Sequence, residues 1–281
     1  MTELYGTDAY SPKQIAERVE SVGVVKARLP LHQMITLGIL AGGFIGLGAM
    51  FFTLVTSDAQ IGFALSRLLG GLSFSLGLIL VVVAGAELFT GNNLLVMAWT
   101  SQKISTSELL KNWAVVFFAN FVGAVGLAVL VALSQYGKLN QGGVLLHMMK
   151  IAVTKSSMPF VEAFFKGILC NILVCLAVWM SLGGRSLTDK IFAIVFPISA
   201  FVACGMEHSV ANMYFIGLGL FQKTFGNLGS DITSTLDLSV LNLTNFSTNL
   251  VAVTLGNLVG GSVMVAIVYH FVYRTKAEET K

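Results

Sequence analysis

The sequence is short of charge. Of its 281 residues, 11% are Asp, Glu, Lys or Arg, whereas 55% are hydrophobic. A soluble domain carries about 25% charged residues, so this chain has too little polar surface for one. We therefore expect an all-α membrane protein throughout. No run of basic residues points to a nucleic-acid partner.

Reactive and ligand-binding motifs are also scarce. The three cysteines, Cys170, Cys175 and Cys204, lie in apolar segments and suggest small buried side chains, not a disulfide framework or a zinc site. No P-loop or dinucleotide fingerprint is present. We expect no metal and no cofactor. Without a nucleophile or a metal set, an enzyme is not expected.

Six apolar segments are long enough to cross a bilayer, which takes about 20 residues. They are residues 34–55, 63–99, 113–133, 160–182, 191–221 and 250–272. The second and the fifth are too long for one simple crossing, and polar residues interrupt both. We therefore expect six transmembrane helices, of which the second and fifth are broken. Residues 226–248 are rich in small polar residues and are expected to form a solvent-facing loop.

The two interruptions resemble each other. Residues 85–93 read Gly-Ala-Glu-Leu-Phe-Thr-Gly-Asn-Asn, and residues 205–213 read Gly-Met-Glu-His-Ser-Val-Ala-Asn-Met. Aligned, they pair Glu87 with Glu207 and Asn92 with Asn212. Each half then holds three crossings, so the halves must form an inverted 3+3 repeat. Such repeats place a transport site near the midplane, where broken helices meet.

Symmetry separates the polar residues of the breaks into two classes. Glu87 and Glu207 recur, which favours a structural role as acceptors for backbone N–H groups freed at the breaks, with proton carriage as the alternative. His208 aligns with Leu88 and has no counterpart, which favours a functional role. Neutral imidazole offers one donor and one acceptor, and its protonated form is a cation. Thr90, at the other break, is a candidate hydrogen-bond partner for His208.

Apolar and basic residues near the breaks are further candidates. Leu88 and Phe89, at the tip of the first break, would form constrictions that strip water from a permeant ion. Phe74 and Leu78 would extend the same walls. Lys155 suits either an ordinary interface lysine or an anion attractor.

The N-terminal segment differs from the rest. Residues 11–29 predict an amphipathic helix, with Ser11 as N-cap and Gln14 completing a capping box, at the cytoplasmic membrane face. We expect three parts: this helix within residues 1–29, a pore domain over 30–274 and a tail over 275–281. Placing both termini in the cytoplasm puts eleven of the seventeen Lys and Arg residues there.

These motifs, with Asn-Leu-Val-Gly-Gly at 257–261, resemble the formate/nitrite transporter family, and most of all the formate channels within it. The resemblance covers essentially the whole chain. It implies a homopentamer of aquaporin-like protomers, each with its own pore, although the Asn-Pro-Ala pair of aquaporins is absent. It also implies functional positions. They are a cytoplasmic slit at Leu78 and Leu88, an outer slit at Phe74, Phe89, Val174 and Phe201, the pair Thr90 and His208, and polar positions at Lys155, Asn171, Glu207, Asn212 and Asn257.

The expected function is a pH-dependent channel for formate and similar small monovalent anions in a bacterial inner membrane. His208 would protonate the anion, and the neutral acid would pass the slits because it loses far less hydration than a carboxylate. Nitrite or hydrosulfide is the alternative substrate, acetate and lactate are further candidates, and a water or glycerol channel is less favoured. The N-terminal helix would occlude the cytoplasmic mouth at low pH or dock a formate-producing enzyme.

Overall fold

The computed structural model describes residues 9–58, 60 and 62–274, and all regular structure in that part of the chain is helical. Of the expected N-terminal part, residues 9–29 are described and contain the helix. Residues 1–8 and the expected tail over 275–281 lie outside the described residues. The longer helices are α1 (Pro12–Ala27), α2 (Leu31–Thr56), α3 (Phe63–Ile79), α5 (Thr106–Leu133), α7 (Phe160–Gly183), α8 (Leu187–Ala203), α9 (Ser209–Phe225) and α11 (Leu243–Leu258). The shorter ones are α4 (Val96–Thr100), α6 (Gly143–Ser156), α10 (Ser230–Thr235) and α12 (Val268–Tyr273).

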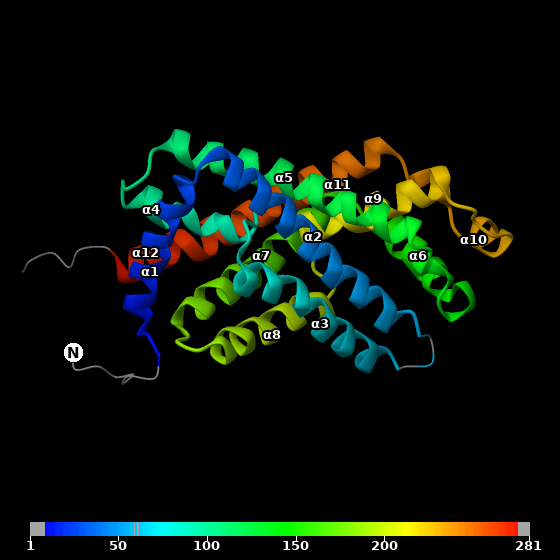
Figure 1. Cartoon of the computed structure of the whole chain (residues 1–281), viewed down its shortest axis with the longest axis horizontal. Helices are drawn as coiled ribbons and strands as arrows, with labels where there is room; N and C mark the ends of the chain where they lie inside the picture. The colour runs from blue at the N-terminus through cyan, green and yellow to red at the C-terminus, as the bar shows by residue number, and fades with distance from the viewer. Residues whose placement is uncertain (1–8, 59, 61, 275–281) are drawn as a thin grey trace, which may run out of the picture.

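Short irregular helical turns join these elements. The π-helical turns η1 (Leu80–Gly85) and η6 (Val259–Ile267) continue α3 and α11, respectively. The 3₁₀ turns are η2 (Gly91–Leu95), η3 (Tyr136–Lys138), η4 (Asn140–Gly142) and η5 (Leu238–Val240). Figure 1 shows α6 and α10 at one end of the molecule, and α1, α4 and α12 at the opposite end.

Five helical stretches of the described chain are long and apolar enough to cross a membrane. They are Leu31–Thr56, Phe63–Gly85, Thr106–Leu133, Phe160–Gly183 and Leu243–Tyr273. The fifth predicted segment is divided between α8 and α9, which have 17 residues each. The all-helical membrane architecture is therefore confirmed, and counting the α8–α9 pair as a sixth crossing stays a prediction.

Both predicted breaks are present, and a glycine marks each. Gly85 has φ +85° and Gly205 has φ +72°, in the left-handed region that glycine adopts without steric penalty. After Gly85 the chain is extended at Ala86, and after Gly205 helical structure resumes at Ser209. The breaks are therefore encoded by one residue each, within otherwise helical segments.

Glycines also allow helices to pack backbone against backbone. A Cβ atom at Gly42 of α2 would lie 2.0 Å from the carbonyl oxygen of Asn120 in α5. In the other half, one at Gly260 would lie 2.2 Å from the carbonyl oxygen of Ile168 in α7. Small residues at such contacts are the usual basis of close helix packing in membranes.

Two segments differ from expectation. Helix α6 lies between the third and fourth predicted crossings, where no helix was expected. The solvent-facing loop expected over 226–248 is wrong in part, because this stretch forms α10, η5 and the start of α11. Its Ile232 and Leu241 are buried against Met149 and Ala152 of α6. An apolar contact that joins two distant segments has no local periodic signal.

Candidate functional site

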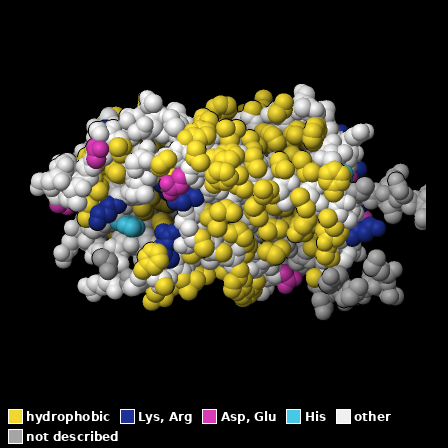
Figure 2. Space-filling model, turned by 180° about the vertical axis from the view of Figure 1, so that it is seen from behind, with side chains coloured by type: hydrophobic (Ala, Val, Ile, Leu, Met, Phe, Trp, Pro, Cys, Tyr) yellow, Lys and Arg dark blue, Asp and Glu magenta, His cyan; other side chains and the backbone are white. Residues whose placement is uncertain are grey.

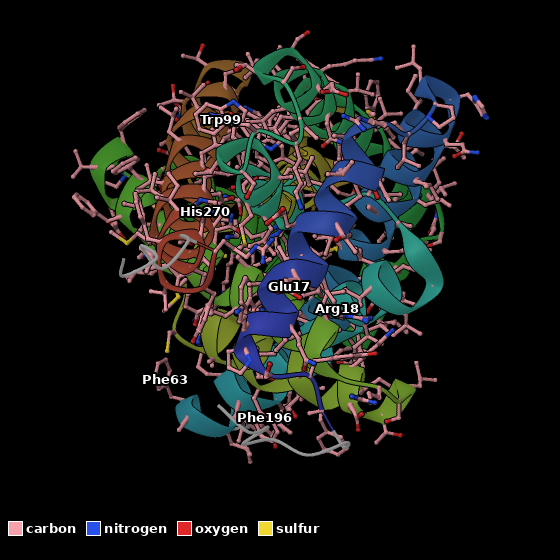
Figure 3. The ribbon with its side chains drawn as sticks, turned by 90° about the vertical axis from the view of Figure 1, so that its left-hand side faces the viewer. Glu17, Arg18, Phe63, Trp99, Phe196 and His270 are labelled. Carbon is pink, nitrogen blue, oxygen red and sulfur yellow. The ribbon has the colours of Figure 1, made fainter. Side chains whose placement is uncertain are left out.

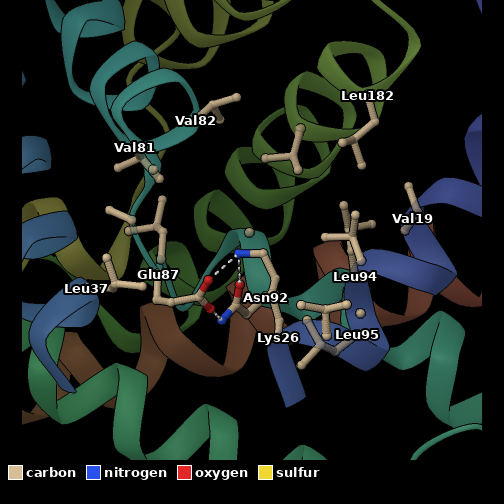
Figure 4. A pocket seen from close by; sticks show the side chains of 18 of the residues that line it. Val19, Lys26, Leu37, Val81, Val82, Glu87, Asn92, Leu94, Leu95 and Leu182 are labelled. Atoms are coloured by element: carbon tan, nitrogen blue, oxygen red, sulfur yellow. Dashed lines mark hydrogen bonds and ion pairs between the residues drawn. The ribbon is translucent and has the colours of Figure 1, made fainter. Parts of the chain in front are cut away.

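Two cavities enter the molecule from opposite ends. The first, here called the α1-side cavity, lies between α1 and the first break and has a volume of about 430 Å³. Its wall includes Lys26, Leu78, Glu87 and Leu88 (Figure 4). Helix α1 lies across this end of the bundle (Figure 3), so it forms part of the cavity wall.

The second, the α6-side cavity, is also about 430 Å³. Its wall includes Phe74, Lys155, Phe201, Glu207 and His208. The two cavities share no lining residue. Together they have the layout of two vestibules separated by a barrier.

The barrier is apolar and thin. Phe74 and Leu78 are one turn apart on α3, yet Phe74 lines the α6-side cavity and Leu78 lines the α1-side cavity. The Phe74 and Phe201 rings meet edge to face, with centroids 5.7 Å apart. Leu88 and Val174 belong to the same buried cluster. Only about one helical turn therefore separates the cavities.

A single polar pair lies at this barrier. Thr90 Oγ1 and His208 Nε2 are 2.9 Å apart, and both side chains are buried. His208 is also the N-cap of α9, since its Nδ1 accepts a hydrogen bond from the backbone N–H of Ala211 at 3.1 Å. With Nδ1 an acceptor, Nε2 must carry the proton of the neutral ring and donate to Thr90. The backbone thus fixes the tautomer of His208.

Polar side chains brace the first break. Lys26 of α1 donates to Glu87 at 2.8 Å and to Asn92 at 3.1 Å, and Asn92 donates to Glu87 at 2.7 Å (Figure 4). Asn120 of α5 donates to the backbone oxygens of Gly38 and Glu87, both at 2.8 Å. Its oxygen accepts the N–H of Phe89 at 2.9 Å. The Glu87 carbonyl and the Phe89 N–H, both freed at the break, are thereby satisfied.

The second break has the same set of contacts. Lys155 of α6 donates to both oxygens of Glu207 at 2.8 Å, and Asn212 donates to Glu207 at 2.6 Å. Asn257 donates to the backbone oxygens of Gly167 and Glu207, and accepts the N–H of Ser209 at 3.0 Å. The repeat therefore extends from sequence motifs to individual hydrogen bonds.

Lys26 is one of the site residues that the sequence motifs did not single out. It lies 129 positions before Lys155, the spacing that also relates Gly38 to Gly167. That shared spacing was the available signal. It makes α1 the structural counterpart of α6. Helix α1 therefore belongs to the inverted repeat, whose helices and break-bracing contacts we call the frame, and is not an appended helix.

Two other predicted residues, Asn171 and Phe89, have defined places. Asn171 of α7 donates to the Thr90 carbonyl at 3.3 Å, to Asn93 at 2.9 Å and to the Asn257 carbonyl at 2.7 Å, so it ties the first break to α11. Phe89 lines neither cavity and packs against Phe117, with centroids 5.1 Å apart. Its role in a slit stays a prediction. Among the described residues, no three His, Cys, Asp or Glu side chains gather as a metal site.

Comparisons with known proteins place this geometry in context. A family model described as formate/nitrite transporter matches residues 13–271. The formate channel FocA of Escherichia coli strain K12 is 40% identical over 273 residues, which is 95% of each chain. A solved structure described as a pentameric formate channel with formate bound is 40% identical. It covers 87% of this chain and 98% of its own, with a TM-score of 0.80.

The wider fold agrees with the aquaporin-like prediction. The aquaglyceroporin from Plasmodium falciparum superimposes with a TM-score of 0.52 at 17% identity, over 85% of this chain and 99% of its own. That likeness concerns the fold alone. The family model, by contrast, spans most of the chain. The chain belongs to the formate/nitrite transporter family.

Proposed function

We propose that the protein is a pH-dependent channel for formate and similar small monovalent anions. The observation that carries the proposal is the buried Thr90–His208 pair at the barrier between two cavities. Neither residue recurs in the repeat, since Thr90 aligns with Val210 and His208 with Leu88. Formate is the substrate named for two relatives that are 40% identical to this chain.

The lysine and arginine distribution supports the sidedness. With α1 in the cytoplasm, the α1-side cavity is the cytoplasmic vestibule and the α6-side cavity is the outer one. Both termini then lie inside, in the inner membrane of a bacterium. The pentameric state of a 40% identical structure supports a homopentamer with one pore per protomer.

The hydrogen-bond directions support a proton-assisted crossing. Nε2–H of His208 donates to Thr90 Oγ1, so the Thr90 hydroxyl proton remains available to a permeant carboxylate. His208 becomes a cation only when Nδ1 releases the Ala211 N–H and takes up a proton. The ring then gives its Nε2 proton to formate and is left neutral with the proton on Nδ1.

The proton transfer lowers the free-energy cost of crossing the apolar barrier. A carboxylate between Leu78, Leu88 and Phe74 would lose its hydration without ionic compensation, whereas formic acid is neutral. The Nε2 proton of His208 converts formate to formic acid before the barrier, and formic acid releases that proton on the far side, so formate and proton cross together. The ring regains its starting tautomer when Nδ1 returns its proton to vestibule water and Nε2 takes one up.

Reconstituted vesicles test the proposal. Formate flux and internal pH are recorded together over a pH series, with nitrite and hydrosulfide compared in the same preparation. We expect formate flux to rise as pH falls and protons to move in step with formate. Formate flux without proton movement at every pH would overturn the protonation step. Flux of nitrite or hydrosulfide alone would overturn the substrate.

A further inference from the structure

The two cavities differ in charge although the frame around them repeats. The charged residues in the wall of the α1-side cavity are Lys26 and Glu87, one of each sign. The wall of the α6-side cavity contains their counterparts, Lys155 and Glu207. It also contains three further cations, Arg67, Lys150 and Lys166.

None of these three cations belongs to the repeat. By the spacings that relate the two halves, Arg67 aligns with Leu187, Lys150 with Ser21 and Lys166 with Leu37. The repeated lysines hold the breaks. The unrepeated cations therefore add positive charge at one end of the pore, beyond what the frame requires.

Arg67 is held in place by neutral groups. Its Nε donates to the carbonyl of Ala203 at 2.7 Å and its Nη2 to that of Val202 at 2.9 Å. Carbonyls fix the guanidinium without cancelling its charge, and Nη1 has no hydrogen bond within the described part of the chain. A Cβ at Gly205 would lie 2.9 Å from Nη2 of Arg67. Gly205 is two residues before Glu207, so the guanidinium of Arg67 lies against the second break.

Lys150 is the second source of excess positive charge in the α6-side cavity. It is exposed on α6, and no ion pair within the described residues involves it. By contrast, Lys166 pairs with Glu162 at 2.6 Å and Lys155 pairs with Glu207. Figure 2 shows basic side chains and a histidine gathered around a hollow towards its left end, the end where α6 and α10 lie.

We propose that the α6-side cavity is an anion-binding vestibule in which Arg67 and Lys150 capture a small monovalent carboxylate before it reaches His208, and that the α1-side cavity has no equivalent site. The inference rests on the proposed function and adds a direction to it. Two uncompensated charges in the wall of one cavity raise the local anion concentration several-fold, and salt screens the effect. Entry from the α6 side then saturates at lower formate concentration than entry from the α1 side.

Flux from each side of vesicles with known protein orientation tests this. Lys150→Gln should raise the half-saturating formate concentration about threefold to tenfold for entry from the α6 side and leave entry from the α1 side unchanged. Lys150→Arg should behave like the native protein. Lys138→Gln is the matched control, because Lys138 is exposed but lines neither cavity. An equal change on both sides, or none, would overturn the inference.

A binding measurement separates this inference from the proposed function. The line width of ¹³C-formate is measured with detergent-solubilised protein, where no conduction is needed. Broadening that Lys150→Gln weakens and Lys138→Gln does not would support the vestibule even if vesicles conducted no formate. Normal formate flux with broadening insensitive to Lys150→Gln would overturn the vestibule and leave the channel intact.

Discussion

At the scale of single residues, His208 combines a structural and a chemical role. Its Nδ1 caps α9 through Ala211, and its Nε2 faces Thr90 across the barrier. A substitution of His208 by a residue without a capping acceptor therefore changes helix stability as well as proton transfer. A useful variant must keep the first role and remove the second.

Asparagine meets that requirement, since it is among the best N-cap residues and does not titrate. We expect His208→Asn and His208→Phe both to lose the rise of formate flux at low pH. His208→Phe should also lose about 1 kcal/mol of stability, because α9 is left uncapped. Flux over a pH series and thermal unfolding in detergent provide the two readouts. An unchanged pH profile in His208→Asn would exclude proton transfer by this ring.

The buried ion pair of Lys155 and Glu207 gives a second prediction. Both side chains are largely buried, and Asn212 also donates to Glu207. Lys155→Met leaves the carboxylate without its cation and should cost about 3–5 kcal/mol. Lys155→Met combined with Glu207→Gln should recover most of that loss. Chemical unfolding of the two variants measures it, and equal losses in both would argue against the pairing.

At the scale of elements, α1 and α6 have equivalent positions but different attachments. Apolar side chains of α10 and η5 pack on α6. Helix α1 has an apolar face as well, at Ile15, Val19 and Ala27, and in addition several ion pairs. Glu20 of α1 is fully buried and pairs with Arg274 and Lys103. Nearby, Arg28 pairs with Glu108 at 3.0 Å. The docking of α1 therefore depends in part on charge.

The pH at which α1 is released follows from Glu20. Burial acts to raise its pKa, but the hydrogen bonds from Arg274 and Lys103 outweigh it, so the pKa of Glu20 is lowered. A lowered pKa means that the stabilisation is complete above about pH 4.5 and is lost as pH falls through the lower folded value. We expect α1 to stay docked between pH 5 and 7 and to become protease-sensitive below about pH 4.5.

Limited proteolysis across that range, with Glu20→Gln as the variant, measures the release. The variant should be sensitive already at pH 7. The other charged or titratable groups on α1 or around it include Lys13, Glu17, Arg18, Lys26, Arg28, His32, Glu87, Lys103, Glu108, His270 and Arg274. Native α1 released at pH 6 would assign control to one of these groups instead of Glu20.

Neighbouring glycines of α2 provide a matched test of helix packing. A Cβ at Gly42 would meet the backbone of α5, whereas one at Gly43 would meet nothing within 4 Å. Gly42→Ala should therefore separate α2 from α5 and cost more than about 3 kcal/mol, and Gly43→Ala should change stability by less than about 0.5 kcal/mol. Thermal unfolding decides, and similar values for both variants would contradict the close contact.

At the scale of the whole molecule, the frame is symmetric and the pore is not. His147 adds to this difference, because it lines the α6-side cavity. Thr56 donates its hydroxyl proton to the Phe52 carbonyl, so its oxygen must accept the hydrogen bond from His147 Nε2 at 2.8 Å. The neutral His147 ring therefore carries its proton on Nε2, and Nδ1 is free to take up a second one. Burial and the nearby Lys150 lower the pKa of His147.

A lowered pKa keeps His147 neutral at pH 7 and charged only below its ordinary value of about 6.5. Acidification on the α6 side should therefore strengthen anion capture from that side. His147→Gln should abolish this fall in the half-saturating concentration and leave the maximal flux dependent on pH through His208. The other charged groups around the cavity are Arg67, Lys150, Lys155, Lys166 and Glu207. One-sided pH jumps measure the effect, and an unaltered response in His147→Gln would exclude it.

The helical membrane fold and both breaks could be predicted from sequence, because they depend on local features. A run of apolar residues specifies a membrane helix, and glycine followed by a carboxylate inside such a run marks its interruption. The pairs Glu87 with Glu207 and Asn92 with Asn212 were visible because the two motifs align without gaps. Position in the repeat thus separated frame residues from unrepeated ones before any contact was known.

Contacts between distant segments needed the tertiary structure. Lys26 reaches Glu87 across 61 positions, and Thr90 meets His208 across 118. Neither contact has a periodic signal, since each depends on how whole helices pack. The same holds for Phe89, which packs on α5 away from the cavities, and for Arg67, which caps the end of α8. The sequence by itself therefore determined where the helices break and which residues recur, and only packing decided which side chains face the pore.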